Sequence, residues 1–139
     1  MDHGFQSVFF PRKKDGLQDL SFLGRAEAEK ARSFHKGFDV YEKTPLVKLR
    51  GLAQQLGVAS VHVKDESFRF GLNAFKVLGG SYALGRYIAS LLGEEIGSLS
   101  PARLASPETH RKTGELTFVT ATDGNHGRGM AWTARRLGH

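Results

Sequence analysis

A single lysine stands among apolar residues and glycines in the stretch NAFKVLGG, residues 73–80. Phe75 precedes Lys76, and two glycines follow in the same turn although glycine costs about 1 kcal/mol relative to alanine inside a helix. Apolar surroundings keep an amine uncharged and nucleophilic, and glycines let a flat ligand approach the backbone closely. The stretch therefore favours a functional Lys76, with an ordinary lysine on a helix surface as the open alternative.

A second unusual stretch, TATDGNHGRG, covers residues 120–129. It follows an apolar, β-branched run, so it lies at the carboxyl end of a predicted strand, where open α/β sheets bind ligands. Backbone N–H groups at the next helix start attract anions. A capped tight turn explains any single residue there, but not the cluster of Asp, Asn, His and glycines. Lysine amines form imines with carbonyl cofactors, most often pyridoxal phosphate (PLP), so the two stretches together suggest a Schiff-base enzyme.

The remaining pattern predicts an α/β fold with parallel strands, because apolar strands alternate with helices along the chain. Thr44-Pro45 resembles a helix cap followed by a first helical residue. The connection at 93–114 is polar, with one short helical turn at most. The predicted helices are 23–35, 45–57, 75–92 and 125–137, and the predicted strands are 60–64 and 116–121.

Composition excludes several classes of protein. The chain has 139 residues, no cysteine and a net charge of +6. No apolar run approaches the roughly 20 residues that span a bilayer, and we expect a cytoplasmic protein without a membrane segment. The basic residues are spread along the chain, which disfavours a nucleic-acid surface. The six histidines are scattered without ligand spacing, so no metal site is predicted.

Together these residues resemble the fold-type II PLP enzymes, the family of tryptophan synthase β, threonine dehydratase and cysteine synthase. Phe75-Lys76 matches the family's Ser-Phe-Lys motif, and Gly124-Asn125-His126 matches its Ser-x-Gly-Asn-His/Thr loop. Two positions depart, since Ala74 replaces a serine and Asp123 stands where the dehydratases carry serine or alanine. The strings RFGLNAFKVLGG, residues 69–80, and TATDGNHGRG are similar to the diaminopropionate ammonia-lyase branch.

The resemblance implies a role for each matching residue. Lys76 would bind PLP as a Schiff base and later act as a base on one face of the substrate, and Asp123 would act on the other face. Cofactor contacts would come from Phe75 beside the ring, from Asn125 at the phenolic oxygen and from Gly124. Thr122 and His126 would receive the substrate carboxylate.

The implied reaction is the α,β-elimination of 2,3-diaminopropionate to pyruvate and ammonia. A dehydratase-like lyase of the same fold is the alternative, and a non-catalytic remnant or basic binding module is the alternative of another class. We expect a three-layer αβα fold with an open, mostly parallel sheet that this chain leaves incomplete. Residues 1–39 would form an arm and helix, and 40–139 would begin the catalytic fold, with the large domain extending to about 92 and the small domain following. The family implies an amino-acid substrate and a homodimer at full length; the chain alone would be inactive.

Overall fold

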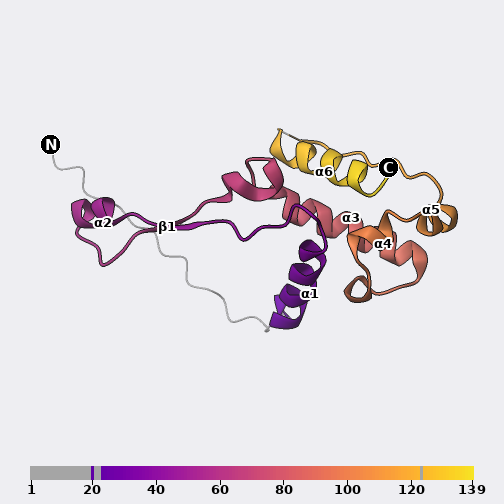
Figure 1. Cartoon of the computed structure of the whole chain (residues 1–139), viewed down its shortest axis with the longest axis horizontal. Helices are drawn as coiled ribbons and strands as arrows, with labels where there is room; N and C mark the ends of the chain where they lie inside the picture. Colours follow the sequence, from indigo (N-terminus) through magenta and orange to yellow (C-terminus); the bar gives the residue numbers. More distant parts are fainter. Residues whose placement is uncertain (1–19, 21–22, 123) are drawn as a thin grey trace, which may run out of the picture.

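The computed structural model describes Leu20, residues 23–122 and residues 124–139. Figure 1 shows a helical body from which a narrow arm projects, with the C-terminus at the end of α6. The predicted arm at 1–20 lies outside the described residues, Leu20 apart. The elements are α1 (Arg25–Lys36), β1 (Leu46–Lys48), α2 (Arg50–Leu56), β2 (His62–Lys64), η2 (Glu66–Gly71), α3 (Lys76–Leu92), η3 (Ile96–Ser98), α4 (Pro101–Leu104), α5 (Pro107–Thr113) and α6 (Asn125–Arg136), where η marks a 3-10 helix.

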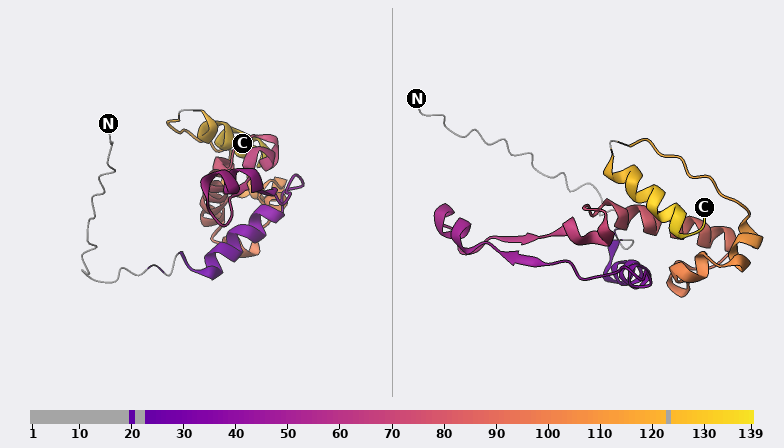
Figure 2. Two further views of the ribbon diagram at one scale, coloured as in Figure 1. Left: turned by 90° about the vertical axis from the view of Figure 1, so that its left-hand side faces the viewer. Right: turned by 45° about the horizontal axis from the view of Figure 1, so that its top comes forward.

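Helix α6 lies along one side of the body, next to α3, and the two helices run in the same direction (Figures 1 and 2). Their contact is made by glycines. A Cβ at Gly129 would lie 2.9 Å from Val77 Cα, and one at Gly80 would lie 2.8 Å from the Met130 sulfur. At Gly129 the neighbouring backbone leaves no room for a larger residue, whereas at Gly80 the flexible Met130 side chain would have to move. The close approach aligns the first turns of the two helices at one end of the body.

The core extends from α3 to the surrounding helices. On α3 the buried residues recur every three or four positions, which gives the helix one apolar face. Helix α1 packs so closely on this face that a Cβ at Gly85 would lie 2.7 Å from the Phe34 ring. The buried apolar cluster comprises Phe34, Phe38, Phe70, Leu72, Val77, Leu84, Ile88, Ala89, Ile96, Leu99, Leu104 and Leu137.

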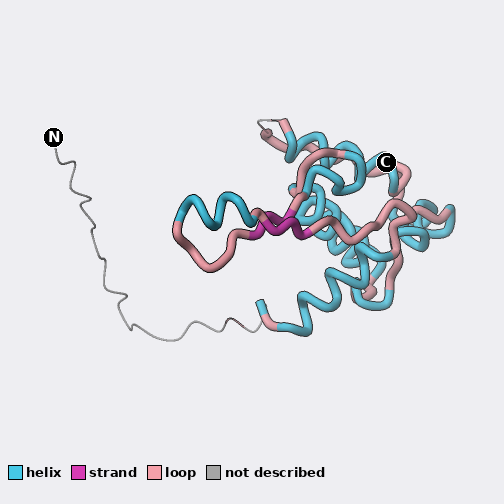
Figure 3. The backbone as a smooth tube through the Cα atoms, turned by 60° about the vertical axis from the view of Figure 1, so that its left-hand side comes forward, coloured by secondary structure: helices cyan, strands magenta, loops and turns pink. Residues whose placement is uncertain are grey.

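The arm consists of β1, α2 and β2 and projects away from the helical body (Figure 3). The two strands pair antiparallel, with Leu46 opposite Lys64 and Lys48 opposite His62. Helix α2 closes the arm and ends at Gly57, whose positive φ of 66° suits glycine. All six strand residues are exposed.

The structure corrects three predictions. The helix predicted from Pro45 begins only at Arg50, because residues 46–48 pair with β2 and long-range pairing overrides the local cap signal. The predicted strand at 116–121 has no regular secondary structure, since no described strand offers its backbone a partner. The one sheet in the described part of the chain is therefore a two-stranded antiparallel pair, not the parallel sheet expected.

The other predicted elements are confirmed in outline. Helices α1, α3 and α6 match the patterns at 23–35, 75–92 and 125–137, and β2 falls inside the predicted strand at 60–64. The connection at 93–114 is more helical than predicted. Ser100 and Ser106 each cap a short helix whose first residue is proline, a signal that the polar composition obscured. Among the described helices, none is long and apolar enough to cross a bilayer.

Candidate functional site

The two stretches singled out in the sequence meet at one end of the body. Lys76 is the first residue of α3, and Asn125 is the first residue of α6. Because Gly129, one turn into α6, packs on Val77, the second residue of α3, the two starting turns are held against each other. The N-terminal end of each helix carries a partial positive charge. An anionic ligand at this end would meet both helix starts.

Most predicted site side chains at this end are open to solvent. Phe75 is 60% exposed, and Lys76, Thr122 and Asn125 are also classed as exposed. His126 is half-buried, and Gly124 is exposed. The structure thus brings together Lys76, Phe75, Thr122, Gly124, Asn125 and His126, whereas Asp123 lies outside the described residues.

The side chain of Thr122 organises the turn before α6. Its Oγ1 accepts hydrogen bonds from the backbone N–H of Gly124, at 3.1 Å, and of Gly127, at 2.7 Å. A Cβ at Gly127 would lie 2.3 Å from Thr122 Cγ2, so this close approach requires glycine. Gly124 adopts φ 136° and ψ −84°, a conformation that side chains rarely permit. With both amides bonded to its oxygen, the Thr122 hydroxyl is left to donate its proton to a ligand.

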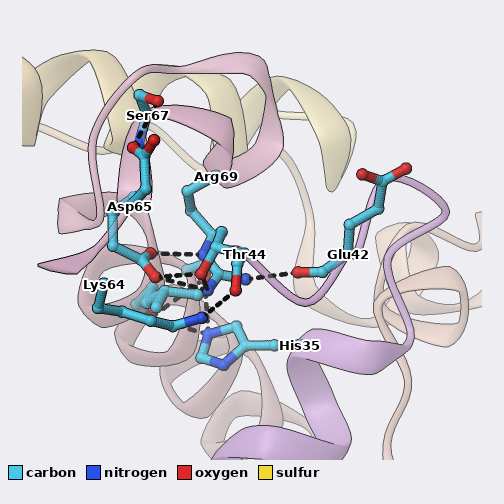
Figure 4. Close-up of polar contacts among 10 residues, drawn as sticks. His35, Glu42, Thr44, Lys64, Asp65, Ser67 and Arg69 are labelled. Atoms are coloured by element: carbon cyan, nitrogen blue, oxygen red, sulfur yellow. Dashed lines mark hydrogen bonds and ion pairs between the residues drawn. The ribbon is translucent and has the colours of Figure 1, made fainter. Parts of the chain in front are cut away.

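A polar cluster at the base of the arm was not predicted from the sequence (Figure 4). Arg69 is 6% exposed and donates to both carboxylate oxygens of Glu66, at 2.8 and 3.0 Å. It also donates to the Glu42 carbonyl at 3.0 Å and to Thr44 Oγ1 at 3.1 Å. Thr44 Oγ1 donates to Glu66 at 2.5 Å, and Lys64 Nζ bonds to the Thr44 carbonyl. We call Thr44, Glu66 and Arg69 the clamp.

The clamp joins the segment before β1 to the segment that leads to Lys76. Arg69, as the main cause, holds the pKa of the Glu66 carboxyl below its usual value, and the Thr44 hydrogen bond adds to the effect. The carboxylate therefore stays ionised at neutral pH and the ion pair is maintained. The sequence signal was the run of charges at 64–69, which reads equally well as a solvated loop.

A buried histidine supports α3 just after Lys76. His35 on α1 is 7% exposed, and its Nε2 lies 2.9 Å from the Leu78 carbonyl and 3.1 Å from Ser81 Oγ. Burial lowers the pKa of His35, and the nearby Arg69 guanidinium lowers it further against the opposing effect of the Leu78 hydrogen bond. A neutral imidazole that donates to the Leu78 carbonyl satisfies this geometry.

The residues at the joined helix starts fit PLP. Lys76 supplies a primary amine, Phe75 supplies an exposed aromatic face, and Asn125 supplies an amide donor at the positive end of a helix. An amine, a flat apolar surface and anion-attracting donors are the groups that a phosphorylated aromatic aldehyde requires. Within the described ranges, no group of three or more His, Cys, Asp or Glu side chains could hold a metal ion.

Comparison with known proteins agrees with this fit. Residues 38–139 match the family described as pyridoxal-phosphate dependent enzyme. The chain belongs to this family. It is 54% identical over 128 residues to the diaminopropionate ammonia-lyase of Salmonella typhimurium, covering 91% of this chain and 32% of that enzyme. It is 46% identical over 116 residues to the Escherichia coli K12 enzyme, covering 84% of this chain and 28% of that enzyme.

Solved structures of PLP family members show the same likeness. The E. coli diaminopropionate ammonia-lyase in apo form superposes with a TM-score of 0.74 at 47% identity, covering 82% of this chain and 30% of that one. The same enzyme in complex with an aminoacrylate-PLP azomethine reaction intermediate gives a TM-score of 0.73 at 41% identity, covering 89% of this chain and 29% of that one. The chain is therefore a homologue of diaminopropionate ammonia-lyase with part of a fold-type II structure. It spans about 30% of the length of these relatives.

Proposed function

We propose that the chain forms part of an ammonia-lyase that converts 2,3-diaminopropionate into pyruvate and ammonia. The observation that carries the proposal is the packing of α3 on α6, which brings Lys76 and the turn at 122–127 to one end of the body. Identity of 54% to the Salmonella enzyme supports the reaction class. Since the chain spans about 30% of such enzymes, we expect it to be inactive without the remainder.

The chain's own residues would bind the cofactor and move protons. PLP, when bound, draws electrons away from the substrate Cα and so makes its proton acidic. Lys76 would hold the cofactor through Nζ and, once released, accept the α-proton on its own face. Phe75 would cover the ring, and Asn125, next to Gly124, would donate to the phenolic oxygen. These assignments agree with the exposure of all four residues at the same end.

The turn before α6 would orient the substrate. Thr122 Oγ1 already accepts hydrogen bonds from two backbone N–H groups, so its hydroxyl proton would be donated to an acceptor such as the substrate carboxylate. His126 follows Asn125 in the first turn of α6, where the helix end favours a negative charge. Thr122 and His126 would therefore fix the substrate carboxylate and present the Cα–H bond to Lys76.

Asp123 would add the second proton acceptor and the preference for a diamino acid. A carboxylate on the face opposite Lys76 would accept the α-proton of the other enantiomer. It would also attract the β-ammonium group of diaminopropionate, which serine and threonine lack. We therefore expect Asp123→Asn to reduce activity on the D-isomer more than activity on the L-isomer.

The segment at 116–121 supports a larger parallel sheet. Leu116, Phe118 and Thr120 are half-buried while Thr117, Val119 and Ala121 are exposed, so the segment alternates as a strand does. Val119 is 91% exposed, and the remaining two thirds of the relatives' length would supply the covering strands and helices. We propose the three-layer αβα fold on this basis. The large domain would then extend from 40 to about 92 and the small domain would follow, in a cytoplasmic homodimer.

A chimera tests the function directly. This chain would replace the matching third of the Salmonella enzyme, and the purified protein would be examined for the visible absorption of lysine-bound PLP and for pyruvate release from diaminopropionate. We expect both signals, and we expect Lys76→Ala to abolish both while Lys64→Ala, which leaves the helix starts intact, keeps the absorption.

The same chimera separates the alternatives. Faster pyruvate release from serine than from diaminopropionate would replace the proposal with a dehydratase-like lyase; the E. coli relative has been solved in complex with D-serine. A folded chimera that neither binds PLP nor releases pyruvate would leave a non-catalytic remnant or binding module as the surviving interpretation.

A further inference from the structure

The segment that leads to Lys76 is strained. Phe70 has φ 52° and ψ 22°, and Asn73 has φ 55°, so two non-glycine residues adopt the left-handed conformation, with Gly71 at φ 69° between them. A bulky residue at positive φ is a true outlier that persists only where its surroundings hold it. This concentration of left-handed residues directly before α3 requires a structural cause.

The cause is an aromatic stack between this segment and α6. The Phe70 ring is 6% exposed and lies on the Trp132 ring, with centroids 5.1 Å apart and planes 18° apart. Phe38 closes the group, at 5.6 Å from Phe70 and 5.4 Å from Trp132. Arg136 covers Trp132, with its Cζ 5.2 Å from the ring, and bonds to Asp39 at 2.6 Å.

The stack joins the two halves of the proposed site. Phe70 lies six residues before Lys76 in the sequence. Trp132 lies on α6, two helical turns after Asn125. A rigid helix transmits the position of Trp132 to Asn125, and a short strained linker transmits the position of Phe70 to Lys76. The Gly129–Val77 contact sets how closely α3 and α6 approach, but it does not fix the path of the linker.

We infer that Phe70 and Trp132 are positioning residues, whose stack orders the linker at 70–75 and so places Lys76 beside the turn at 122–127. The first half of this inference concerns the chain alone, and the second half, the use of Lys76 by a cofactor, rests on the proposed function. Phe68, in the same 3-10 segment, provides the contrast, because its side chain is 59% exposed. Ordering of the linker therefore requires an aromatic ring at position 70 but not at position 68.

Amide hydrogen exchange of the 139-residue chain tests the first half. In the native chain the Leu72 amide bonds to the Arg69 carbonyl at 2.9 Å, and the Leu78 amide bonds to the Phe75 carbonyl at 3.0 Å. We expect Phe70→Leu and Trp132→Leu each to accelerate exchange at 72–78 by about tenfold, since local opening governs the rate. Their effects should not add in the double variant, because the two rings form one contact. Phe68→Leu should leave exchange at the native rate.

Two further variants separate the stack from general destabilisation and from backbone strain. Leu104→Ala shortens a side chain that is fully buried in α4, outside the aromatic group of Phe38, Phe70 and Trp132. If it accelerates exchange at 72–78 as much as Phe70→Leu does, relative to the rest of the chain, the inference is wrong. Phe70→Asn tolerates the left-handed conformation but lacks the ring. An exchange rate at 72–78 in Phe70→Asn that equals the native rate would likewise overturn the inference.

Covalent trapping tests the second half. The chain is incubated with PLP, reduced with borohydride and digested, and the share of label on Lys76 among all lysines is measured by mass spectrometry. We expect Lys76 to be preferred in the native chain and in Phe68→Leu, and to lose its preference in Phe70→Leu and Trp132→Leu. Absence of preference in the native chain would overturn the cofactor role of Lys76, whereas the exchange rates alone decide whether the stack orders the linker.

Discussion

The arm and the helix pair differ in where their apolar side chains lie. On α3, Val77, Leu84 and Ile88 are at most 3% exposed, and Leu137, directly after α6, is fully buried. Along the arm, by contrast, Leu46, Val47, Leu52, Leu56, Val58 and Val63 are between 40% and 65% exposed. The helix pair therefore gains its stability from burying apolar surface, whereas the arm gains little from that source.

Polar contacts hold the arm where packing does not. The strands pair with each other, and the clamp ties both ends of the arm to the body through Arg69 (Figure 4). An exposed row of apolar residues on a projecting strand pair marks a surface that other parts of a protein cover. Within the proposed enzyme, the remaining two thirds of the relatives' length would provide that cover. The helix pair positions Lys76 and the turn at 122–127, and the exposed arm is the region that we expect the rest of the enzyme to cover.

The largest difference should appear when one apolar side chain is shortened in each region. Ile88→Ala removes a fully buried side chain and should lower the free energy of unfolding by about 2–5 kcal/mol. Leu56→Ala in the arm removes a side chain that is 60% exposed and should change it by no more than about 0.5 kcal/mol. Urea unfolding followed by circular dichroism measures both. Equal losses would show that the arm is packed as tightly as the body.

The clamp should matter for the arm more than for the body. Arg69→Met removes the ion-pair partner of Glu66 and the donor to the Glu42 carbonyl, and it should cost roughly 2–3 kcal/mol, because hydrogen bonds to charged groups are strong. Amide exchange should rise at 46–64 and stay low in α3 and α6. Arg50→Met, at an exposed position in α2, is the matched control and should leave both regions unchanged. A uniform rise throughout the chain would refute a local role for the clamp.

The contact of α3 with α6 should tolerate no added methyl group. Gly129→Ala places a Cβ 2.9 Å from the Val77 backbone and should destabilise the chain by about 1–3 kcal/mol. Gly51→Ala in α2 meets no atom within 4 Å and should stabilise the chain by up to about 1 kcal/mol through helix propensity. Thermal unfolding measures both changes in stability. Changes of opposite sign would confirm the comparison, and two stabilising substitutions would disprove the close packing of α3 on α6.

Sequence patterns identified the helix pair but only one strand of the arm, β2. The spacing of Met130, Ala134 and Leu137 predicted α6, and the apolar positions of α3 are also regular, because one helix face meets the core. The path of 45–49 depends instead on pairing with 62–64, which local patterns do not contain. The segment at 116–121 has strand character but no partner among the described residues, so its propensity alone formed no strand.

The candidate site was also predicted only in part. The motifs at 73–80 and 122–127 identified which residues gather at the helix starts, because their chemistry is carried by residue type. The supports were missed, since the clamp and the stack of Phe70 on Trp132 depend on contacts between residues distant in sequence. Asp123 lies outside the described residues, and its role stays a prediction.

The smallest expected effect is the change of folding stability with pH that arises from His35. Its pKa is lowered in the folded chain from the ordinary value of 6.5, so the unfolded chain binds a proton first as the pH falls. The stability that neutral His35 contributes is therefore complete above pH 6.5 and is lost as the pH falls below this value towards the folded pKa.

His35→Gln, which keeps an amide donor for the Leu78 carbonyl, should flatten the dependence of unfolding free energy on pH in the range below 6.5. His139 also has a lowered pKa, caused mainly by burial and then by His110, and so contributes a slope of the same sign. The difference between variant and native chain, measured by urea unfolding across this range, isolates His35. Glu66 is already ionised there, because its lowered pKa moves its effect to more acidic solution. A slope in His35→Gln that equals the native slope would show that the pH dependence does not arise in the core beneath α3.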